Sequence, residues 1–369
     1  MLEKLTITNF KNFKDIVLDF GNIRNYDFNN EIIKNNIISK ILILGANASG
    51  KSNIGLAIFD IINHLTDKNK KLDEYTDYLN YNNLIEEKYA SFIYIFKFGE
   101  EKVRYEYKKE DAETVIEEKL FINDILCVEY NKKQKIVKVE IKEHVNNFEN
   151  FNSNLAAEGF EKLSLVKYIK GNTLPKKNGV LENFFEFIDS MLWIRSLQEG
   201  NTYMGYKNGS GKIMKEIVEN NKIKEFETFL NEAGIPIKLI EDEGKISVIF
   251  ESGEKVGFYK IASSGTKVLA LLFLWLEISM KNVSFLFIDE FDAYFHHTLS
   301  KFILKKVFQN DNIIQVALSS HSTFLISNEV LRPDCYYILN RNGEIKQLSE
   351  ITNKKIEEKG TLIQNIRKL

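Results

Sequence analysis

The feature that most constrains the fold is the stretch Gly45-Ala46-Asn47-Ala48-Ser49-Gly50-Lys51-Ser52, which fits the phosphate-loop pattern G-x-x-x-x-G-K-[ST] without a gap. An apolar run, 41–44, precedes it, and a segment with helical spacing, 54–65, follows it. In this context backbone N–H groups and a positive helix end surround phosphate oxygens. We therefore expect the loop and the adjoining Asn53 to bind ATP. Lys51 would reach the β- and γ-phosphates, and the Ser52 hydroxyl would bind Mg²⁺.

A second signal is the acidic pair Asp289-Glu290, which directly follows the continuous apolar run 284–288. Such a run is typical of a strand buried on both faces of a parallel sheet. We expect Asp289 to hold the Mg²⁺ bound by Ser52, and Glu290 to activate the attacking water as the catalytic base. The alternative is that both acids only favour the N-terminus of a following helix.

His321 lies just past the next apolar strand, 313–318. The carboxyl ends of strands line the ligand crevice of an open parallel sheet, so this histidine is placed to hydrogen-bond the γ-phosphate. A purely structural role is the alternative for a lone histidine.

Ser263-Ser264-Gly265 precedes a long apolar helix that extends to Ile278. Small hydroxyl residues and a glycine at a helix start are a further possible anion site, although the pattern is weak by itself.

Two other patterns resemble binding sites but are better explained as surface features. The pair His296-His297 invites a metal-ligand interpretation, but neighbouring helix residues point in different directions, which favours surface packing. The segment 205–212 resembles a second phosphate loop, but its first glycine is out of register and no apolar strand leads into it. We interpret it as a surface loop.

Changes in hydrophobic periodicity divide the chain into four segments. Residues 1–88 hold the N-terminal half of the nucleotide-binding lobe, and 241–369 hold its C-terminal half. Between them, 89–145 has the period of two that predicts antiparallel strands at 92–98, 103–107, 115–122 and 136–141. Residues 146–240 are predicted to be a helical insertion, since helical spacing extends from 151 to 230 without sustained heptads.

The composition of the chain indicates in which compartment the protein works. A net charge of −2 argues against a surface that binds polyanions along its whole extent. The two cysteines, Cys127 and Cys335, are far apart and lack a C-x-x-C pattern, which predicts neither a disulfide framework nor a zinc site. The N-terminus has no apolar signal region, and the most apolar stretch, 268–278, is too short to span a bilayer. We expect a cytoplasmic protein with no membrane contact.

Taken in order, the motifs are Ile7–Phe13 (ITNFKNF), GANASGKS, SSGTK, FLFIDEFDAYFH and SSHS. This set resembles the ABC-type ATPase heads of the SMC and overcoming-lysogenization-defect (OLD) proteins. A closer similarity is to the stand-alone AAA-type ATPases of bacterial phage-defence systems. It extends to Leu331-Arg332-Pro333-Asp334 and to Glu117–Leu120.

The resemblance implies an α/β fold, a P-loop NTPase of ABC-ATPase head type. It would have a mixed sheet flanked by helices, an antiparallel β lobe and a helical insertion. It also implies a homodimer, or a higher homo-oligomer, formed through the ATP sites. Ser264 and Gly265 match the signature that contacts the γ-phosphate held by the opposite subunit. Asp292 matches the D-loop and His321 the switch histidine.

The sequence departs from the family in three places. The signature is SSGT rather than the LSGGQ of transporter ATPases, which favours the soluble branch. The Q-loop glutamine is not placed, with Gln134 and Gln198 as candidates. The chain ends 48 residues after His321, where OLD nucleases continue into a Toprim domain. We therefore expect a separate effector protein, a nuclease or toxin, in antiphage defence.

Two alternative functions stay open. One is a DNA-repair ATPase that clamps duplex DNA, and the other is an ATP-stabilised scaffold with little turnover.

Overall fold

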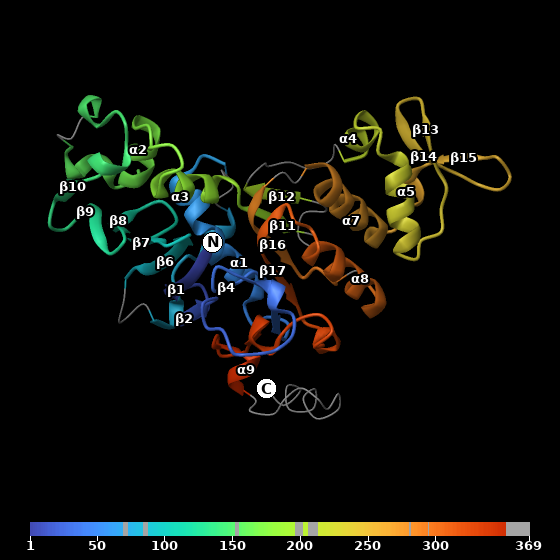
Figure 1. Ribbon diagram of the computed structural model, residues 1–369, viewed down its shortest axis with the longest axis horizontal. Helices are drawn as coiled ribbons and strands as arrows, with labels where there is room; N and C mark the ends of the chain where they lie inside the picture. Colours follow the sequence, from blue (N-terminus) through green and yellow to red (C-terminus); the bar gives the residue numbers. More distant parts are fainter. Residues whose placement is uncertain are drawn as a thin grey trace.

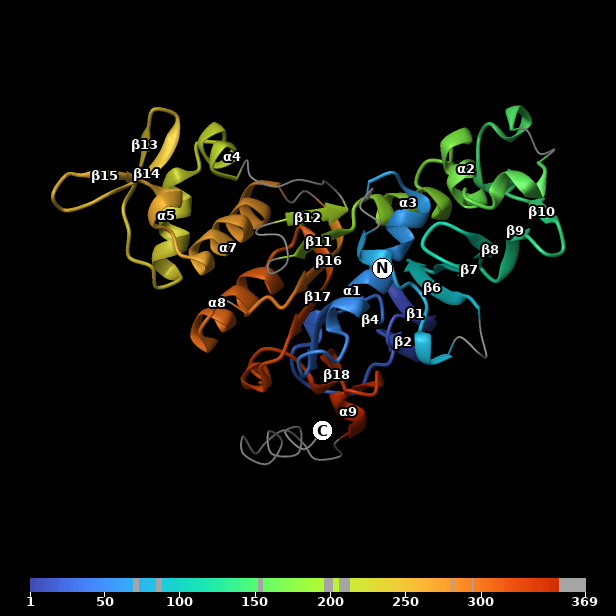
Figure 2. The same ribbon diagram turned by 180° about the vertical axis from the view of Figure 1, so that it is seen from behind.

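Two seven-stranded sheets organise the chain, one mainly parallel and one antiparallel (Figure 1). The computed structural model describes residues 1–68, 73–83, 88–151, 155–195, 202–205, 213–279, 282–293 and 295–351. The antiparallel lobe lies at one end of the molecule and a small three-stranded sheet lies at the other, with the parallel sheet between them (Figure 2).

The parallel sheet carries the nucleotide-binding motifs. Its strand order is β12-β11-β16-β17-β5-β18-β19, in which the five inner strands are parallel and both edge strands pair antiparallel. Its strands are β5 (Lys40–Gly45), β11 (Leu192–Arg195), β12 (Thr202–Gly205), β16 (Val283–Asp289), β17 (Ile313–Ser320), β18 (Tyr336–Leu339) and β19 (Ile345–Gln347). The apolar side chains of the central strands are buried on both faces, as the continuous runs in the sequence predict.

The antiparallel sheet has the order β10-β9-β8-β7-β6-β1-β2. Its strands are β1 (Leu2–Phe10), β2 (Phe13–Asp19), β6 (Ala90–Phe98), β7 (Glu101–Lys109), β8 (Val115–Ile122), β9 (Ile125–Asn131) and β10 (Ile136–Val139). In β6 and β7 buried and less buried residues alternate, so one face packs on the core. The period of two in the sequence therefore predicts this sheet correctly, although it misses β9.

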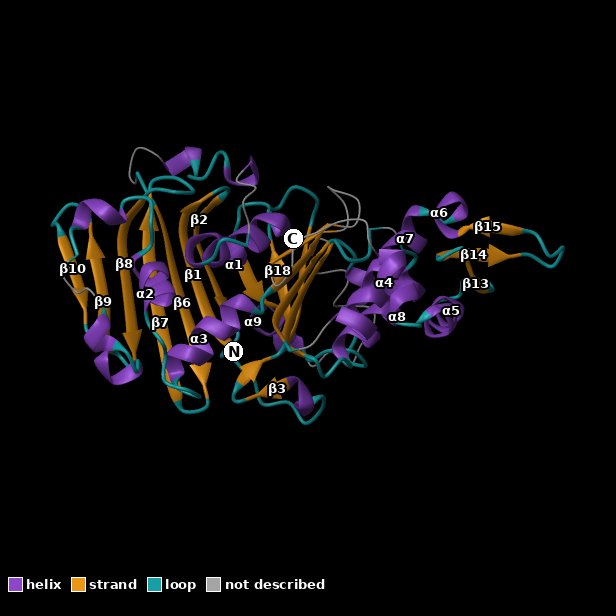
Figure 3. Cartoon of the chain, turned by 90° about the horizontal axis from the view of Figure 1, so that it is seen from above, coloured by secondary structure: helices purple, strands orange, loops and turns teal. Residues whose placement is uncertain are grey.

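Helices form layers on the two faces of the parallel sheet (Figure 3). The helix after the phosphate loop, α1 (Lys51–Leu65), and α3 (Val180–Asp189) lie between the two large sheets, whereas α7 (Ser264–Phe273) and α8 (His297–Phe308) cover the opposite face. At Gly55 the α1 backbone packs directly on the sheet, since a Cβ there would lie 2.6 Å from Phe287 Cε1 and 2.8 Å from Trp193 Cζ2.

The remaining elements are short. They are β3 (Ile33–Lys34), β4 (Ile37–Ile38), α2 (Leu165–Asn172), α4 (Ile213–Glu219), α5 (Ile223–Glu232), β13 (Leu239–Asp242), β14 (Lys245–Ile249), β15 (Lys255–Gly257), α6 (Phe258–Ile261), the π-helical segment Leu274–Ser279 and α9 (Leu348–Ile351). None of the helices in the described ranges is long and apolar enough to cross a bilayer. Both cysteines are buried and free.

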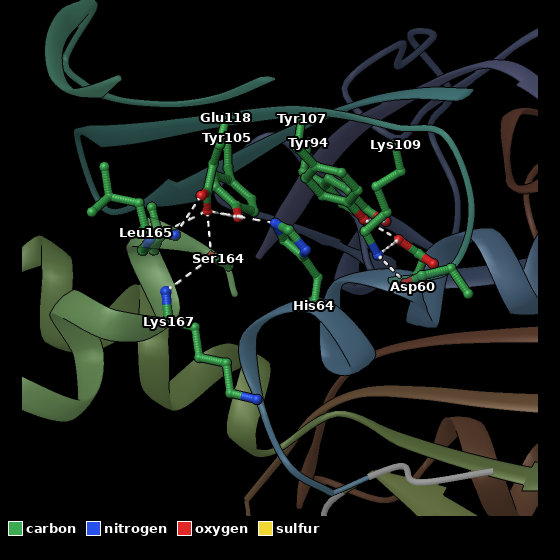
Figure 4. A network of polar contacts seen from close by, with 12 residues as sticks. Asp60, His64, Tyr94, Tyr105, Tyr107, Lys109, Glu118, Ser164, Leu165 and Lys167 are labelled. Atoms are coloured by element: carbon green, nitrogen blue, oxygen red, sulfur yellow. Dashed lines mark hydrogen bonds and ion pairs between the residues drawn. The ribbon is translucent and has the colours of Figure 1, made fainter. Parts of the chain in front are cut away.

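A buried polar network ties α1 to the antiparallel lobe (Figure 4). Asp60 of α1 accepts hydrogen bonds from Tyr107 (2.7 Å) and from Lys109 (3.0 Å) of β7. One helical turn on, His64 Nε2 lies 3.5 Å from the Glu118 carboxylate of β8. Both acids are fully buried, so each requires these donors to offset its loss of hydration. The network positions the helix that begins at the phosphate loop.

The predicted fold class is confirmed: an α/β P-loop NTPase of ABC-ATPase head type, with a mixed sheet flanked by helices and an antiparallel β lobe. One prediction about the middle of the chain is wrong. Helical spacing was expected throughout 151–230, but β11 lies there and pairs with β16 inside the parallel sheet. Leu192-Trp193-Ile194 is a short run buried on both faces, and periodicity does not distinguish such a strand from a buried helix. The four segment boundaries stay a prediction.

Candidate functional site

The phosphate loop begins where β5 ends and closes at the first residue of α1. Ala46, Asn47 and Ala48 are exposed, and Ala48 (φ 62°) and Gly50 (φ 105°) both have left-handed backbones. Gly50 is the N-cap of α1, and no side chain caps this helix end. The first N–H groups of α1 therefore have no side-chain acceptor and are available to an anion.

Lys51 brings the phosphate loop and the acidic pair together. Its side chain is 3% exposed, and its ammonium group donates to the carbonyl oxygens of Gly45 and Ala46, both at 3.0 Å. The same nitrogen lies 3.9 Å from Glu290 Oε1. Burial lowers the pKa of Lys51, and the Glu290, Asp289 and Asp292 carboxylates partly offset that effect. The positive charge is thus held beside the predicted catalytic base.

Ser319, at the end of β17, connects the two acidic residues. Its hydroxyl donates to Asp289 Oδ1 at 2.6 Å and accepts from the Glu290 N–H at 2.7 Å. Glu290 has a left-handed backbone, φ 43°, which is uncommon outside glycine and is frequent at functional sites. The backbone therefore turns sharply between the predicted metal ligand and the predicted base.

Asp292 is connected to the next residue of β17 in the same way. Ser320 Oγ donates to Asp292 Oδ2 at 2.7 Å and accepts from the Ser322 N–H at 2.9 Å. Asp292 is buried, and its Oδ1 has no hydrogen-bond partner among the described residues. Ser320 thus joins the predicted D-loop to the segment that carries His321.

Asn12, in the turn between β1 and β2, contacts the phosphate loop from the antiparallel lobe. Its Nδ2 donates to the Ser49 carbonyl at 3.0 Å, and its Oδ1 accepts from Asn53 Nδ2 at 2.8 Å. A Cβ at Gly50 would lie 2.5 Å from Asn12 Nδ2, so the loop fits against this side chain only with glycine there. Sequence reasoning missed Asn12, Ser319 and Ser320, although all three lie within the motifs ITNFKNF and SSHS.

The predicted signature residues lie apart from the phosphate loop. Ser263 is the N-cap of α7, and its Oγ accepts from the Thr266 N–H at 3.2 Å. Ser264 is exposed at the first position of this helix. α7 and α1 lie on opposite faces of the parallel sheet (Figure 3). Among the described residues no hydrogen bond or ion pair links Ser264, the first residue of α7, to the phosphate loop.

The structure places the other candidates as follows. His321 is exposed just after β17 and has no hydrogen bond to a described residue. The rings of His296 and His297 are 3.9 Å apart at the exposed start of α8. Gln134 lies in the turn between β9 and β10, in the part of the antiparallel sheet farthest from β1. Gln198 and most of the segment 205–212 lie outside the described residues.

The chemistry of the donors fits ATP with Mg²⁺. Ser52 and Asp289 supply the hard oxygen ligands that Mg²⁺ prefers, and Mg²⁺ usually takes one or two carboxylates plus phosphate oxygens. Among the described residues there is no cluster of three or more histidine, cysteine or acidic side chains that could hold a metal ion. The phosphate loop also contains a polar group that forms no hydrogen bond: the buried Ser49 hydroxyl has no partner among the described residues.

The fold and this site define a P-loop ATPase of ABC-head type. The sequence profile of the family described as "AAA domain, putative AbiEii toxin, Type IV TA system" matches residues 41–327, and the chain belongs to this family. The matched region begins in β5 and ends after His321, so it includes the phosphate loop, the predicted signature residues and the acidic pair. No curated protein sequence matches the chain significantly.

Solved structures with a similar course of the chain are heads of SMC proteins. The SMC head domain from Thermotoga maritima is 16% identical, with a TM-score of 0.45 over 94% of this chain and 98% of that chain. An SMC head bound to the C-winged helix domain of ScpA has the same identity and TM-score, over 94% and 96%. An SMC head with an extended coiled coil, from Pyrococcus furiosus, is 15% identical with a TM-score of 0.41, over 99% of both chains.

Proposed function

We propose that this protein binds ATP with Mg²⁺ and hydrolyses the γ-phosphate bond, with Glu290 as the catalytic base. The observation that carries the proposal is the 3.9 Å approach of Lys51 Nζ to Glu290 Oε1. It supports a single site that contains both Lys51 and the acidic pair, which are far apart in the sequence. A carboxylate in this position is suited to orient a water molecule for in-line attack on the γ-phosphate.

Each residue of the site has a part in this proposal. The loop Gly45–Asn53 binds the phosphates through backbone N–H groups and the Lys51 ammonium. Ser52 and Asp289 would hold Mg²⁺, which neutralises charge on the phosphate oxygens when it is bound. Ser319 would orient Asp289, and His321, which is exposed just after β17, would contact the γ-phosphate.

The proposal includes a head-to-head homodimer. Ser264 is exposed at the start of α7, with Ser263 and Gly265 beside it, and no hydrogen bond or ion pair connects it to the phosphate loop of its own chain in the described structure. A second copy would bring this helix start, with its positive dipole end, to the γ-phosphate of the first. ATP binding would close the dimer and hydrolysis would open it.

In the cell, we propose that the dimer senses infection and controls a separate effector, a nuclease or toxin, in the cytoplasm. The family description names a putative toxin of a type IV TA system, which supports an ATPase that works together with another protein.

The test is ATP turnover of Glu290→Gln beside Glu100→Gln, an exposed glutamate in the β6–β7 turn. We expect Glu290→Gln to lower kcat by about 10²–10⁴-fold, as removal of a general base does, and Glu100→Gln to leave it unchanged. Size-exclusion chromatography with ATP should show Glu290→Gln as a persistent dimer. Unchanged turnover of Glu290→Gln would contradict the role of Glu290, and a monomer with bound ATP would contradict the dimer.

A further inference from the structure

A cavity of about 530 Å³ lies at the edge of the parallel sheet opposite the phosphate loop. β5 runs from Lys40, in the cavity wall, to Gly45, where the phosphate loop begins. The other walls come from the segment 29–34, the C-terminal end of α8, the turn at Asp311 and residues 329–330. The volume is within the range that binds small organic ligands.

Lys40 is the distinctive residue of this cavity. The residue is 6% exposed, and its ammonium nitrogen is not among the fully buried atoms, so it keeps contact with the cavity. The ammonium group forms no hydrogen bond or ion pair with any described residue. A buried charge without a partner costs folding free energy, so such a group is rarely kept without a counter-ion. Its side chain lines the cavity, which makes the cavity the place from which a counter-ion reaches it.

The charge state of Lys40 reflects this position. Burial lowers the pKa of its amine to about 8; the nearby Lys34 ammonium acts in the same direction and the Asp311 carboxylate against it. At neutral pH the amine still carries its proton in the folded protein. An anion in the cavity would therefore meet a positive charge that no protein group neutralises at hydrogen-bond distance.

The other charged side chains of the wall limit the kind of anion. Three lysines and three carboxylates line the cavity, namely Lys34, Lys40, Lys305, Glu31, Asp311 and Glu329. No pair of these six side chains lies within ion-pair distance in the described structure. The carboxylates repel a ligand with many negative charges, such as a polyphosphate or a nucleic acid, and a single negative charge is favoured. Apolar surface is present too, from Ile32, Phe308 and Val330.

We propose that this cavity, the Lys40 cavity, binds a small organic carboxylic acid whose carboxylate pairs with the Lys40 ammonium and whose apolar part contacts Ile32, Phe308 and Val330. The site is separate from the ATP site and does not depend on the proposed ATPase activity. Since Lys40 and Gly45 are the two ends of one strand, the ligand contacts the same strand that carries the phosphate loop.

The test uses sodium butyrate as the probe, with butylammonium chloride as a cation of the same length and with ionic strength held constant. Thermal unfolding is measured for the wild-type chain, for Lys40→Met and for Lys346→Met, an exposed lysine on β19. We expect butyrate to raise the Tm of the wild type and of Lys346→Met, but not that of Lys40→Met. Butylammonium should raise none of them. Without butyrate, Lys40→Met should unfold at a higher temperature than the wild type, because it removes an unpaired buried charge.

A second measurement needs no variant. Acetylation of Lys40 in the wild-type chain, followed by peptide mass spectrometry, should slow about tenfold when butyrate is present at ten times its Kd. Lys346 in the same sample should react at an unchanged rate. The proposal is overturned if butyrate raises the Tm of Lys40→Met as much as that of the wild type. It is overturned equally if butyrate neither raises the wild-type Tm nor protects Lys40.

Discussion

The hydroxyl group of Ser319 donates a hydrogen bond of 2.6 Å to the Asp289 carboxylate. It also accepts the backbone N–H of Glu290 at 2.7 Å. One side chain at the end of β17 therefore orients the predicted metal ligand and positions the residue that follows it. Second-layer hydrogen bonds of this kind fix the direction of a carboxylate lone pair toward a metal ion.

Ser319→Ala should weaken the apparent Mg²⁺ affinity by about 10–100-fold, the usual effect of losing a hydrogen bond to a metal ligand. The measurement is ATP turnover as a function of Mg²⁺ concentration. Ser252→Ala, in the exposed β14–β15 turn, is the matched control and should follow the wild-type curve. If Ser319→Ala saturates at the same Mg²⁺ concentration as the wild type, Asp289 does not need this hydrogen bond.

Asn12→Ala should weaken ATP binding by up to about 30-fold, because two hydrogen bonds to the loop region, each with a net contribution of about 1 kcal/mol, are lost. Asn12→Asp should weaken ATP binding more than Asn12→Ala does. It keeps the acceptor for Asn53 but replaces the donor to the Ser49 carbonyl with a negative charge beside the phosphate site. The Kd for a fluorescent ATP analogue measures both. Equal affinity of Asn12→Asp and the wild type would show that Asn12 does not shape the loop.

The contrast between these residues shows what the sequence is able to predict. The phosphate loop and Asp289-Glu290 are local patterns, and in the structure each lies where a buried strand of the parallel sheet ends, as its pattern predicts. Asn12 and Ser319 act across the fold, and nothing in their immediate neighbours shows which group they will contact. The strand β11 was missed for a related reason, since its membership of the parallel sheet depends on pairing with β16, a distant segment.

The buried Glu118 predicts how stability depends on pH. Its carboxylate accepts hydrogen bonds from Tyr105, from Ser164 Oγ (2.5 Å) and from the Leu165 N–H (2.7 Å). Burial raises the pKa of Glu118, but contacts with His64, Ser164 and Tyr105 outweigh it and bring the pKa below its usual value. Burial, with a further contribution from Lys109, lowers the pKa of His64.

Both pKa shifts make the folded protein less stable as the pH falls. The reason is that in each case the unfolded chain takes up a proton more readily than the folded one. For His64 the free energy of unfolding is highest above pH 6.5 and falls as the pH drops below it. For Glu118 it falls further as the pH drops below 4.5. Urea denaturation from about pH 2.5 to pH 8 measures this slope. Glu118→Gln should be less stable at pH 7 and should flatten the profile below pH 4.5. A variant with the wild-type slope there would exclude Glu118 as the cause.

Gly55→Ala should destabilise the protein by about 1–3 kcal/mol, the usual cost of adding an atom to a filled core. The new Cβ would lie 2.6 Å from Phe287 Cε1 and 2.8 Å from Trp193 Cζ2, so α1 has to move away from the sheet or the rings have to shift. Gly171→Ala in α2 is the matched control. A Cβ there meets no atom within 4 Å, so the substitution should be neutral or stabilising, since alanine favours helix.

The double variant Gly55→Ala, Phe287→Leu separates crowding from a general effect on α1. Leucine removes the ring atom that the new methyl group meets. The two substitutions should therefore be less destabilising together than the sum of their separate effects, by about 0.5–3 kcal/mol for residues in contact. Urea denaturation of the two single variants and the double variant measures the difference. Strict additivity would mean that Gly55 is required for a reason other than the close approach of α1 to β16.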